Sequence, residues 1–510
     1  MALKSEFTKP NFSVFEKLAK KGNLIPIVEE ISADLDTPVS IFLKIAHELP
    51  HAFLLESVEL GENLGRFSLI GINPLVTLEY SIQKGTKIYD TSTKKIELSK
   101  LPFPDLMQHM LKQYQYVTEP LLPPLVGAFV GYIGYELVQE FETIKLHSKK
   151  MLPLPDAILF LPKTLVIFDH IKHSLKVVCL AVVKNQVREA YHSAICSIEQ
   201  VTKQIKKPAH SQIFKSSKLK SRPRKQSTSR FHSNMSQNKF ESNVKIAKRH
   251  IQAGDCIQIV LSQRFSLGKI KNPFAVYRAL RSLNPSPYMF YFRHGNLKLV
   301  GSSPELLVRK QKSKVEVRPI AGTRPRGINA EEDAANESEL CASKKELAEH
   351  LMLVDLGRND LGRVAQTNSV HVPKFARIEK YSHVMHLVSD VEATLKKSCT
   401  MMDLLRATFP AGTVTGAPKI KAMEMIDQLE RESRGPYAGC LGYLGLTGDM
   451  DMCITIRTIV IHHNQAYVQA GAGIVNDSNP SAEYQETLNK ARALFQAVER
   501  ARGTSHDSDD

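Results

Sequence analysis

Short apolar segments rich in β-branched and aromatic residues recur through the first 200 residues of this chain. The clearest lie at residues 53–58, 125–130, 157–160, 164–168 and 175–183. Such segments are typical of buried strands. Helix-like stretches lie among them, but strands and helices do not alternate regularly as they do in a parallel doubly wound sheet. The pattern therefore favours an α+β fold.

The length and composition indicate a globular protein with more than one structural unit. A chain of 510 residues can bury a large core, and its apolar fraction of 43% is ordinary for such proteins. The sequence has no stretch of 18 uncharged apolar residues that would predict a membrane-spanning helix, and its first residues lack the apolar centre of a signal peptide. The seven cysteines form no Cys-x-x-Cys pair, so we expect a cytoplasmic protein without a disulfide framework or a zinc ribbon.

The net charge of +16 is concentrated in one polar segment. Residues 203–230 contain ten Lys and Arg residues and no Asp or Glu, and the rest of the chain carries only +6. Low hydrophobicity and charge repulsion predict a disordered linker at 203–235, with a docking site for an acidic partner as the alternative. A nucleic-acid-binding protein is the alternative of a different class, but the basic residues are not interleaved with stacking aromatic residues. The linker would separate an N-terminal lobe, 1–202, from a second domain, 236–503, which a frayed tail, 504–510, follows.

Two segments of the second domain share one arrangement of glutamates. Residues 345–354 and 483–491 each have apolar residues at helical spacing on one face. These faces consist of Leu347, Leu351 and Val354 in the first segment and of Tyr484, Leu488 and Ala491 in the second. Beside each face stands a pair of glutamates three residues apart, Glu346 with Glu349 and Glu483 with Glu486. Four carboxylates on two helices suit a hard cation such as Mg2+, whereas a single pair is more often a solvated helix face.

Two glycine-containing segments are predicted to be loops that bind anions. Residues 318–327 contain three arginines, two prolines and two glycines, which disfavour both helix and strand. Guanidinium and backbone N–H groups in such a loop would recognise a carboxylate. Residues 469–475 read Gln-Ala-Gly-Ala-Gly-Ile-Val and follow a strand-like run at 453–461. Glycines there would let N–H groups approach an anion closely, although a tight turn is the commoner role of this pattern.

These motifs, together with residues 355–364 and 409–419, resemble those of the chorismate-utilising enzymes. The resemblance covers essentially the whole chain except 203–235 and the tail, and it implies two large antiparallel sheets packed face to face with helices outside. Ala321 stands where aminodeoxychorismate synthases typically have a nucleophilic lysine, and Gln258 where isochorismate and salicylate synthases typically have a lysine that activates water. Because glutamine cannot act as that base, the resemblance points to the anthranilate synthases, with aminodeoxychorismate synthase component I as the alternative.

The resemblance also implies a reaction and a set of partners. Ammonia would add at C2 of chorismate as the 4-hydroxyl leaves, giving 2-amino-2-deoxyisochorismate, and loss of pyruvate would then give anthranilate. A separate glutamine amidotransferase subunit would supply the ammonia, in a heterotetramer of two large and two small subunits. The chain itself has no Gly-x-Cys-x-Gly nucleophile motif. Neither nucleic acid nor membrane is expected to take part.

Individual residues receive roles from the same resemblance. Acid–base catalysis is expected of His386 and Glu339, and Glu337 stays open as an alternative to Glu339. Mg2+ would be bound by Glu349 and Glu486 directly and by Glu346 and Glu483 through water. Chorismate would contact Gly322, Thr323, Tyr437, Arg457, Gly471, Ala472 and Gly473. L-Tryptophan would bind as a feedback inhibitor at Ser57, Pro287, Tyr288 and Met289.

Overall fold

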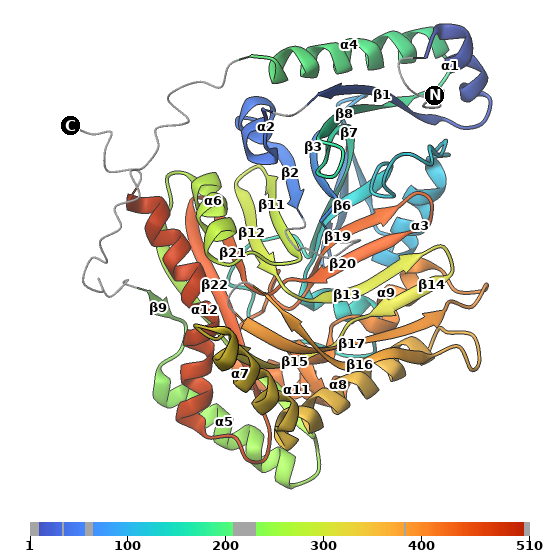
Figure 1. Ribbon diagram of the computed structural model, residues 1–510. Coiled ribbons are helices and arrows are strands. Elements are labelled where there is room, and N and C mark those ends of the chain that lie inside the picture. The colour runs from blue at the N-terminus through green and yellow to red at the C-terminus, as the bar shows by residue number, and fades with distance from the viewer. Residues whose placement is uncertain (1–9, 33–34, 57–64, 208–230, 382–383, 504–510) are drawn as a thin grey trace.

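The computed structural model describes residues 10–32, 35–56, 65–207, 231–381 and 384–503 (Figure 1). Their strands form two large antiparallel sheets, and helices lie outside the strands. The helices are α1 (Phe12–Ala19), α2 (Pro38–Ile45), α3 (Phe103–Gln113), the 3-10 helix η1 (Tyr135–Glu140), α4 (Val187–Ile205), α5 (Gln237–Gln252), α6 (Pro273–Leu283), α7 (Ala330–Ala342), α8 (Lys344–Gly362), α9 (Met401–Thr408), α10 (Gly412–Thr415), α11 (Lys419–Glu430) and α12 (Pro480–Gly503).

The first sheet begins in the N-terminal region and ends beside α12. Its order is β1 (Leu24–Ser32), β8 (Ser174–Val182), β7 (Ala157–Asp169), β3 (Phe67–Ser81), β2 (His51–Glu56), β11 (Tyr288–His294), β12 (Leu297–Ser303), β21 (Thr458–His462), β22 (Gln465–Ile474) and β10 (Gln258–Lys269). Two short strands, β9 (His232–Ser233) and β18 (Gly416–Ala417), also pair with β10.

The second sheet shares β3 and β7 with the first. Its order is β5 (Lys95–Ser99), β4 (Gly85–Asp90), β3, β7, β6 (Ala128–Ile133), β19 (Cys440–Gly445), β20 (Met450–Ile454), β13 (Leu306–Gln311), β14 (Lys314–Val317) and β17 (Val384–Thr394). β15 (Ile320–Pro325) and β16 (His371–Lys380) complete it on the two sides of β17.

Two prolines mark the place where β3 and β7 pass from one sheet to the other. Pro74 of β3 faces Pro162 of β7, and the register shifts between Pro74 and Val76. Proline has no N–H to donate, so the ladder is weakest here and both strands can change direction. One half of each strand therefore pairs in the first sheet and the other half in the second.

Aromatic side chains fill the space between the sheets. Phe292 of β11 stacks on Phe160 of β7 with ring centroids 5.3 Å apart, and Tyr132 of β6 meets Phe292 edge-on. Phe53, Tyr132, Phe160 and Phe292 are all fully buried. This face-to-face packing confirms the expected α+β fold with two large antiparallel sheets.

The predicted division of the chain at residues 203–235 is not a division of the sheets. β2 pairs with β11 and β6 pairs with β19, so each sheet continues from strands that precede that segment to strands that follow it. Within the predicted linker, 203–235, α4 extends to Ile205 and β9 begins at His232. Residues 208–230 and the tail, 504–510, lie outside the described residues. Among the helices that the structure describes, none is both long and apolar enough to span a bilayer.

Candidate active site

The segment 318–327 contains a strand, and the prediction of a loop is wrong. β15 pairs with β17, and its two prolines do not interrupt the ladder because Pro319 precedes the strand and Pro325 is its last residue. Gly322 has φ +64° at a register shift, which is the bulge that a glycine permits. The guanidinium groups of the three arginines are also not free to bind a ligand. They pair with protein carboxylates, Arg318 with Asp390, Arg324 with Glu346 and Arg326 with Asp333.

The bulge in β15 holds the imidazole of His386 on β17. His386 Nδ1 lies 3.1 Å from the carbonyl oxygen of Gly322 and 2.9 Å from Thr323 Oγ1. A carbonyl oxygen only accepts hydrogen bonds, so Nδ1 carries the proton and Nε2 keeps its lone pair. Burial, and then the positive charge of Arg457, lower the pKa of His386. At neutral pH the ring is therefore uncharged, with Nε2 able to take a proton.

The glycine segment 469–475 is likewise a strand, and its prediction as a loop is wrong. Gly471, Ala472 and Gly473 lie in β22 and pair with β10. The glycines are needed for close approach rather than for a turn. A Cβ atom at Gly471 would lie 2.7 Å from the Tyr437 hydroxyl, and one at Gly473 would lie 2.6 Å from Gln258 Nε2. The alternate residue, Ala472, is fully buried.

Arg457 interrupts the run predicted as one strand at 453–461. β20 ends at Ile454 and β21 begins at Thr458, and Arg457 between them has φ +50°. Its Nη1 donates to the carbonyl oxygen of Lys490 (3.1 Å). Burial lowers the pKa of Arg457, while Tyr437 and Glu486 act in the opposite direction. The break in the strand thus places the partly buried guanidinium of Arg457 close to Tyr437 and to Glu486 of α12.

The four predicted carboxylates lie on α8 and α12, and their charges interact. Burial is the largest cause of the raised pKa of Glu349, and the charges of Glu346 and Glu486 raise it further. Burial also raises the pKa of Glu483, and Glu486 contributes to that shift. Uncompensated carboxylates that repel one another in this way would be relieved by a bound cation. One detail of the helix was predicted wrongly: Leu351 is 50% exposed, because the buried face of α8 is formed by His350, Leu353, Val354 and Gly357.

Side-chain cations partly balance these carboxylates. Lys490, one turn after Glu486 on α12, lies 2.6 Å from Glu486 Oε1 and donates to the carbonyl oxygen of Gly471 (3.1 Å). Within the described ranges, no three His, Cys, Asp or Glu side chains converge closely enough to form a metal cage. Mg2+ does not require one, since it binds one or two carboxylates and keeps several waters. The oxygen donors and their mutual repulsion therefore fit Mg2+ at this position.

Gln258 joins this group from β10. Its side chain is buried, and Nε2 lies 3.5 Å from Glu349 Oε1, at the limit of a hydrogen bond. In the part of the chain that the structure describes, Gln258 Oε1 has no hydrogen-bond partner. The amide orientation follows from Glu349, because a carboxylate accepts from the NH2 group and not from the oxygen. The amide oxygen remains an unused acceptor in the site.

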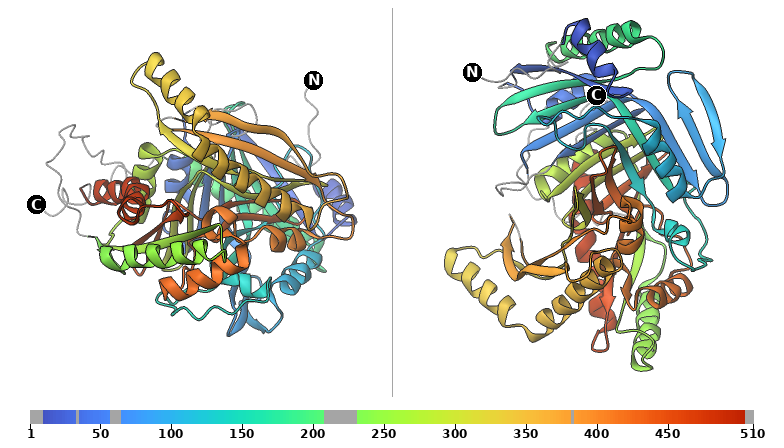
Figure 2. Two further views of the ribbon diagram at one scale, coloured as in Figure 1. Left: turned by 90° about the horizontal axis from the view of Figure 1, so that it is seen from below. Right: turned by 90° about the vertical axis from the view of Figure 1, so that its right-hand side faces the viewer.

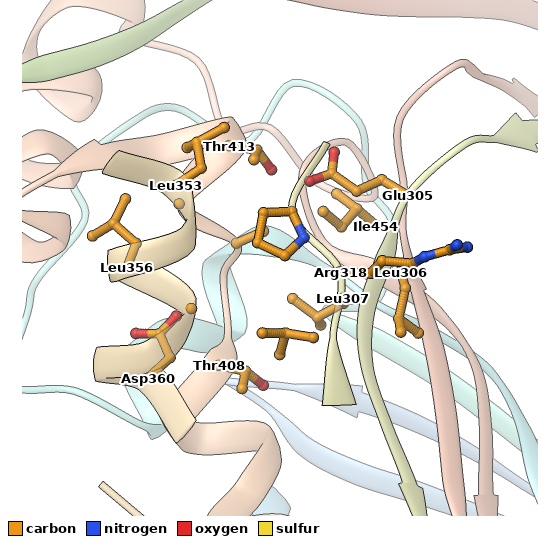
Figure 3. A pocket seen from close by; sticks show the side chains of 15 residues that line it. Glu305, Leu306, Leu307, Arg318, Leu353, Leu356, Asp360, Thr408, Thr413 and Ile454 are labelled. Atoms are coloured by element: carbon orange, nitrogen blue, oxygen red, sulfur yellow. The ribbon is translucent and has the colours of Figure 1, made fainter. Parts of the chain in front are cut away.

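Glu305 is a buried acid that the sequence analysis missed. It lies between β12 and β13, is 7% exposed, and burial raises its pKa to about 8 against the opposing effects of Thr413 and Lys490. Figure 3 shows its carboxyl group at one end of a pocket that also contains Thr413 and, toward the other end, Asp360 of α8. The only sequence signal was a single glutamate between two apolar strands, which is weak.

Glu339, the predicted acid, is placed differently. It lies on α7, which stands at the periphery of the molecule in both views of Figure 2, and its side chain is 65% exposed. Arg324 Nε donates to its Oε1 (3.1 Å). Its alternative, Glu337, pairs with Lys380 (2.7 Å). The structure thus brings together the predicted residues on β15, β17, β22, α8 and α12 but leaves Glu339 and Glu337 at an outer surface.

Comparison with known proteins agrees with this arrangement. The profile of the chorismate binding enzyme family matches residues 51–496. Anthranilate synthase component 1 of Acetivibrio thermocellus is 42% identical over 496 residues, covering 96% of this chain and 99% of that protein. The Neisseria gonorrhoeae anthranilate synthase component 1 is 44% identical, with 95% and 97% covered. The chain belongs to the anthranilate synthase component 1 family.

Solved structures show the same relationship. The crystal structure of anthranilate synthase component I from Streptococcus pneumoniae TIGR4 matches with a TM-score of 0.73 and 36% identity, covering 91% of this chain and 99% of that one. The menaquinone-specific isochorismate synthase of Escherichia coli shares the fold with a TM-score of 0.68 at 19% identity. Membership of the anthranilate synthase component 1 family also agrees with Ala321, which is buried in β15 beside Gly322 where a lysine would mark a different branch.

The two motifs predicted to bind tryptophan in this family meet in the first sheet. Met289 of β11 pairs with Glu56 of β2, and residues 54–56 lie beside residues 289–291, so the ends of the two motifs meet. Pro287 and Met289 are buried, and the Tyr288 hydroxyl donates to Asp451 (3.0 Å). Ser57 lies outside the described residues. The structure thus brings together the sequence segments, and the inhibitor site itself stays a prediction.

Proposed function

We propose that this protein binds chorismate with Mg2+, aminates C2 of the ring with ammonia and then eliminates pyruvate to give anthranilate. The observation that carries the proposal is a partly buried site in which the charge of Glu486 on α12 interacts with Glu349 of α8 and with Arg457, which lies beside Tyr437. Gln258 and Ala321 stand at the two positions where the family resemblance places lysines in related synthases. Lys490, an amine at this site, forms an ion pair with Glu486. Aminodeoxychorismate synthase component I is not favoured.

Substrate recognition would use the two charges of chorismate. The Arg457 guanidinium, with the Tyr437 hydroxyl beside Gly471, would hold one carboxylate. Mg2+ held by Glu349 and Glu486, with Glu346 and Glu483 behind water, would bind the other carboxylate and neutralise its charge. Gly471 and Gly473 let the Tyr437 hydroxyl and the Gln258 amide lie directly against β22, where they would face the substrate. Positioning by these groups would supply much of the rate.

Glu305 is suited to the first chemical step. With its pKa near 8 the carboxyl is mostly protonated at pH 7, so it can give a proton to the departing 4-hydroxyl, which leaves as water. Ammonia adds at C2 as that bond breaks and loses one proton afterwards, so the step involves no oxidation or reduction. The free acceptor on Gln258 can accept a hydrogen bond from ammonia and so orient it.

His386 is suited to the second step. Its Nε2 lone pair can remove the hydrogen from C2 as the bond to the enolpyruvyl oxygen breaks. The ring then becomes aromatic, and the enolpyruvyl group takes up a proton and leaves as pyruvate. Thr323 and Gly322 fix the tautomer that makes Nε2 the base.

The reaction can be tested directly with purified protein, chorismate, MgCl2 and ammonium chloride at pH 8. We expect the blue fluorescence of anthranilate and one equivalent of pyruvate per turnover. Leaving out ammonium should abolish product. Formation of isochorismate, of 4-amino-4-deoxychorismate or of a covalent adduct with the protein would contradict the proposal.

A second subunit is expected to supply ammonia in the cell. The relatives are named component 1, which implies a component 2. A glutamine amidotransferase in a cytoplasmic complex of two large and two small subunits would meet this requirement. Glutamine should then replace ammonium only when that subunit is added.

Ser57→Phe should abolish inhibition by L-tryptophan while turnover stays within about twofold of the wild type. A phenyl ring at residue 57 would fill the space that the family resemblance predicts for the inhibitor. The measurement is the tryptophan concentration that halves the initial rate. Unchanged inhibition in the variant would place the inhibitor elsewhere.

A further inference from the structure

The segment that carries Tyr437 has an unusual backbone. It joins α11 to β19, and Arg431, Gly435 and Ala438 have φ values of +58°, +59° and +63°. Residues with a side chain rarely adopt such angles, and they keep them only where neighbouring groups fix the conformation. The groups that hold this segment therefore matter for the position of the Tyr437 hydroxyl.

Those groups come from the N-terminal part of the chain. Glu136 of η1 accepts hydrogen bonds from the backbone N–H groups of Arg434 (2.6 Å) and Gly435 (2.9 Å). The N–H of Tyr135 donates to the carbonyl oxygen of Gly435 (2.8 Å). Two consecutive residues of η1 thus bind three backbone groups immediately before Pro436 and Tyr437. Hydrogen bonds from N–H groups to a carboxylate are about twice as strong as those to a neutral acceptor.

The side chain of Arg434 connects this held backbone to Tyr437. Its guanidinium pairs with buried Glu430 (2.6 Å) and donates to the carbonyl oxygen of Val260 (2.8 Å). The same guanidinium lies over the rings of Tyr135 and Tyr437, 4.8 Å and 5.6 Å from their centroids. The main chain of Arg434 is held by Glu136, and its side chain packs on the tyrosine.

We propose that Glu136 is a positioning residue for Tyr437, which keeps the tyrosine hydroxyl against Gly471 in the substrate site. The part of this proposal that concerns chorismate binding rests on the proposed function. The part that concerns the position of Tyr437 does not. Burial, and to a smaller extent Asp156, raise the pKa of Glu136 to about 7, against the hydrogen bonds from Arg434 and Gly435. Experiments at pH 8 therefore test the carboxylate form.

A matched control lies at the same junction. Asp427 of α11 accepts hydrogen bonds from the backbone N–H groups of His147 (2.7 Å) and Ser148 (2.8 Å). Here a carboxylate of the C-terminal part binds the backbone of the N-terminal part, the reverse of Glu136. Asp427→Asn should remove a similar interaction without touching residues 434–437. Glu136→Gln keeps the volume of the side chain but leaves one N–H facing an amide NH2 group.

The first test follows Tyr437 without any substrate. The chain contains no tryptophan, so Tyr437→Trp provides a single fluorophore, and the cavity that Tyr437 shares with Thr455 and Val468 gives it room. Adding Glu136→Gln should shift its emission to longer wavelength and increase quenching by acrylamide, whereas adding Asp427→Asn should change neither. An emission spectrum unaffected by Glu136→Gln would overturn the proposal, even if the protein has no activity toward chorismate.

The second test uses the native tyrosine. Glu136→Gln should raise the KM for chorismate about tenfold with little change in kcat, and the double variant with Tyr437→Phe should be no worse than Tyr437→Phe alone. A purely structural role predicts instead a lower melting temperature with unchanged KM, and effects of the two substitutions that multiply. Either of those results would reject Glu136 as a positioning residue.

Discussion

Replacing Glu349, a proposed direct ligand, with glutamine should raise the Mg2+ concentration needed for half-maximal activity by about 100-fold or more, because loss of an outer-shell partner alone costs about 10–100-fold. The substitution preserves the volume of the side chain but removes its negative charge. That charge belongs to a cluster of carboxylates in which Glu346 and Glu486 raise the pKa of Glu349. Carboxylate oxygens are the ligands that Mg2+ prefers. Glu486→Gln should act in the same direction.

The same variant should bind Mg2+ more weakly but should be more stable than the wild type when Mg2+ is absent. Because the pKa of Glu349 is raised in the folded protein, its ionisation opposes folding at pH 8, and glutamine removes that cost. Without Mg2+ the variant should therefore unfold at a higher temperature than the wild type. With MgCl2 the wild type should gain stability and Glu349→Gln should gain little, since a ligand stabilises only the state that binds it.

Thermal unfolding with and without MgCl2 measures both the stability of the variant and its binding of Mg2+, and it does not depend on catalysis. Glu424→Gln on α11 is a suitable control, because Glu424 is an exposed carboxylate that pairs with Lys421 (3.5 Å). The control should show the wild-type response to Mg2+. Equal stabilisation of the wild type and Glu349→Gln by Mg2+ would remove Glu349 from the metal site.

The comparison of sequence with structure separates two kinds of prediction. Helical spacing was enough to place Glu346, Glu349, Glu483 and Glu486 on two helices, because the period of a helix fixes which side chains share a face. The preference of Pro and Gly for loops gave the wrong structure for 318–327 and 469–475. Both are strands, because prolines at strand ends and glycines at close approaches are compatible with pairing that only the partner strand reveals.

Burial distinguishes the predicted acid, Glu339, from the acid that we propose, Glu305. Glu339 and Glu305 are both glutamates near polar neighbours in the sequence, and nothing in their spacing shows which one folding removes from water. In the structure one is 65% exposed and the other 7% exposed. A raised pKa depends on tertiary packing, so the sequence could indicate the family but not which of these two carboxyls folding buries.

Glu305→Gln should lower kcat by about 10²–10⁴-fold, the usual contribution of a general acid. In the wild type, kcat should fall tenfold per pH unit above about 8, because the donor must be protonated and its pKa lies near that value. The variant should lose this dependence, since glutamine does not titrate. Glu339→Gln is the matched comparison and should retain both the rate and the wild-type pH profile.

Stability measurements distinguish lost chemistry from lost structure in Glu305→Gln. The folded-state pKa of Glu305 is raised above its unfolded value, so its contribution to stability is present at low pH and disappears as pH rises through about 8. The melting temperature of the wild type should therefore fall between pH 6 and pH 9 by more than that of Glu305→Gln. If Glu339→Gln loses activity while Glu305→Gln keeps it, the proton comes from α7 and the buried carboxyl has another role.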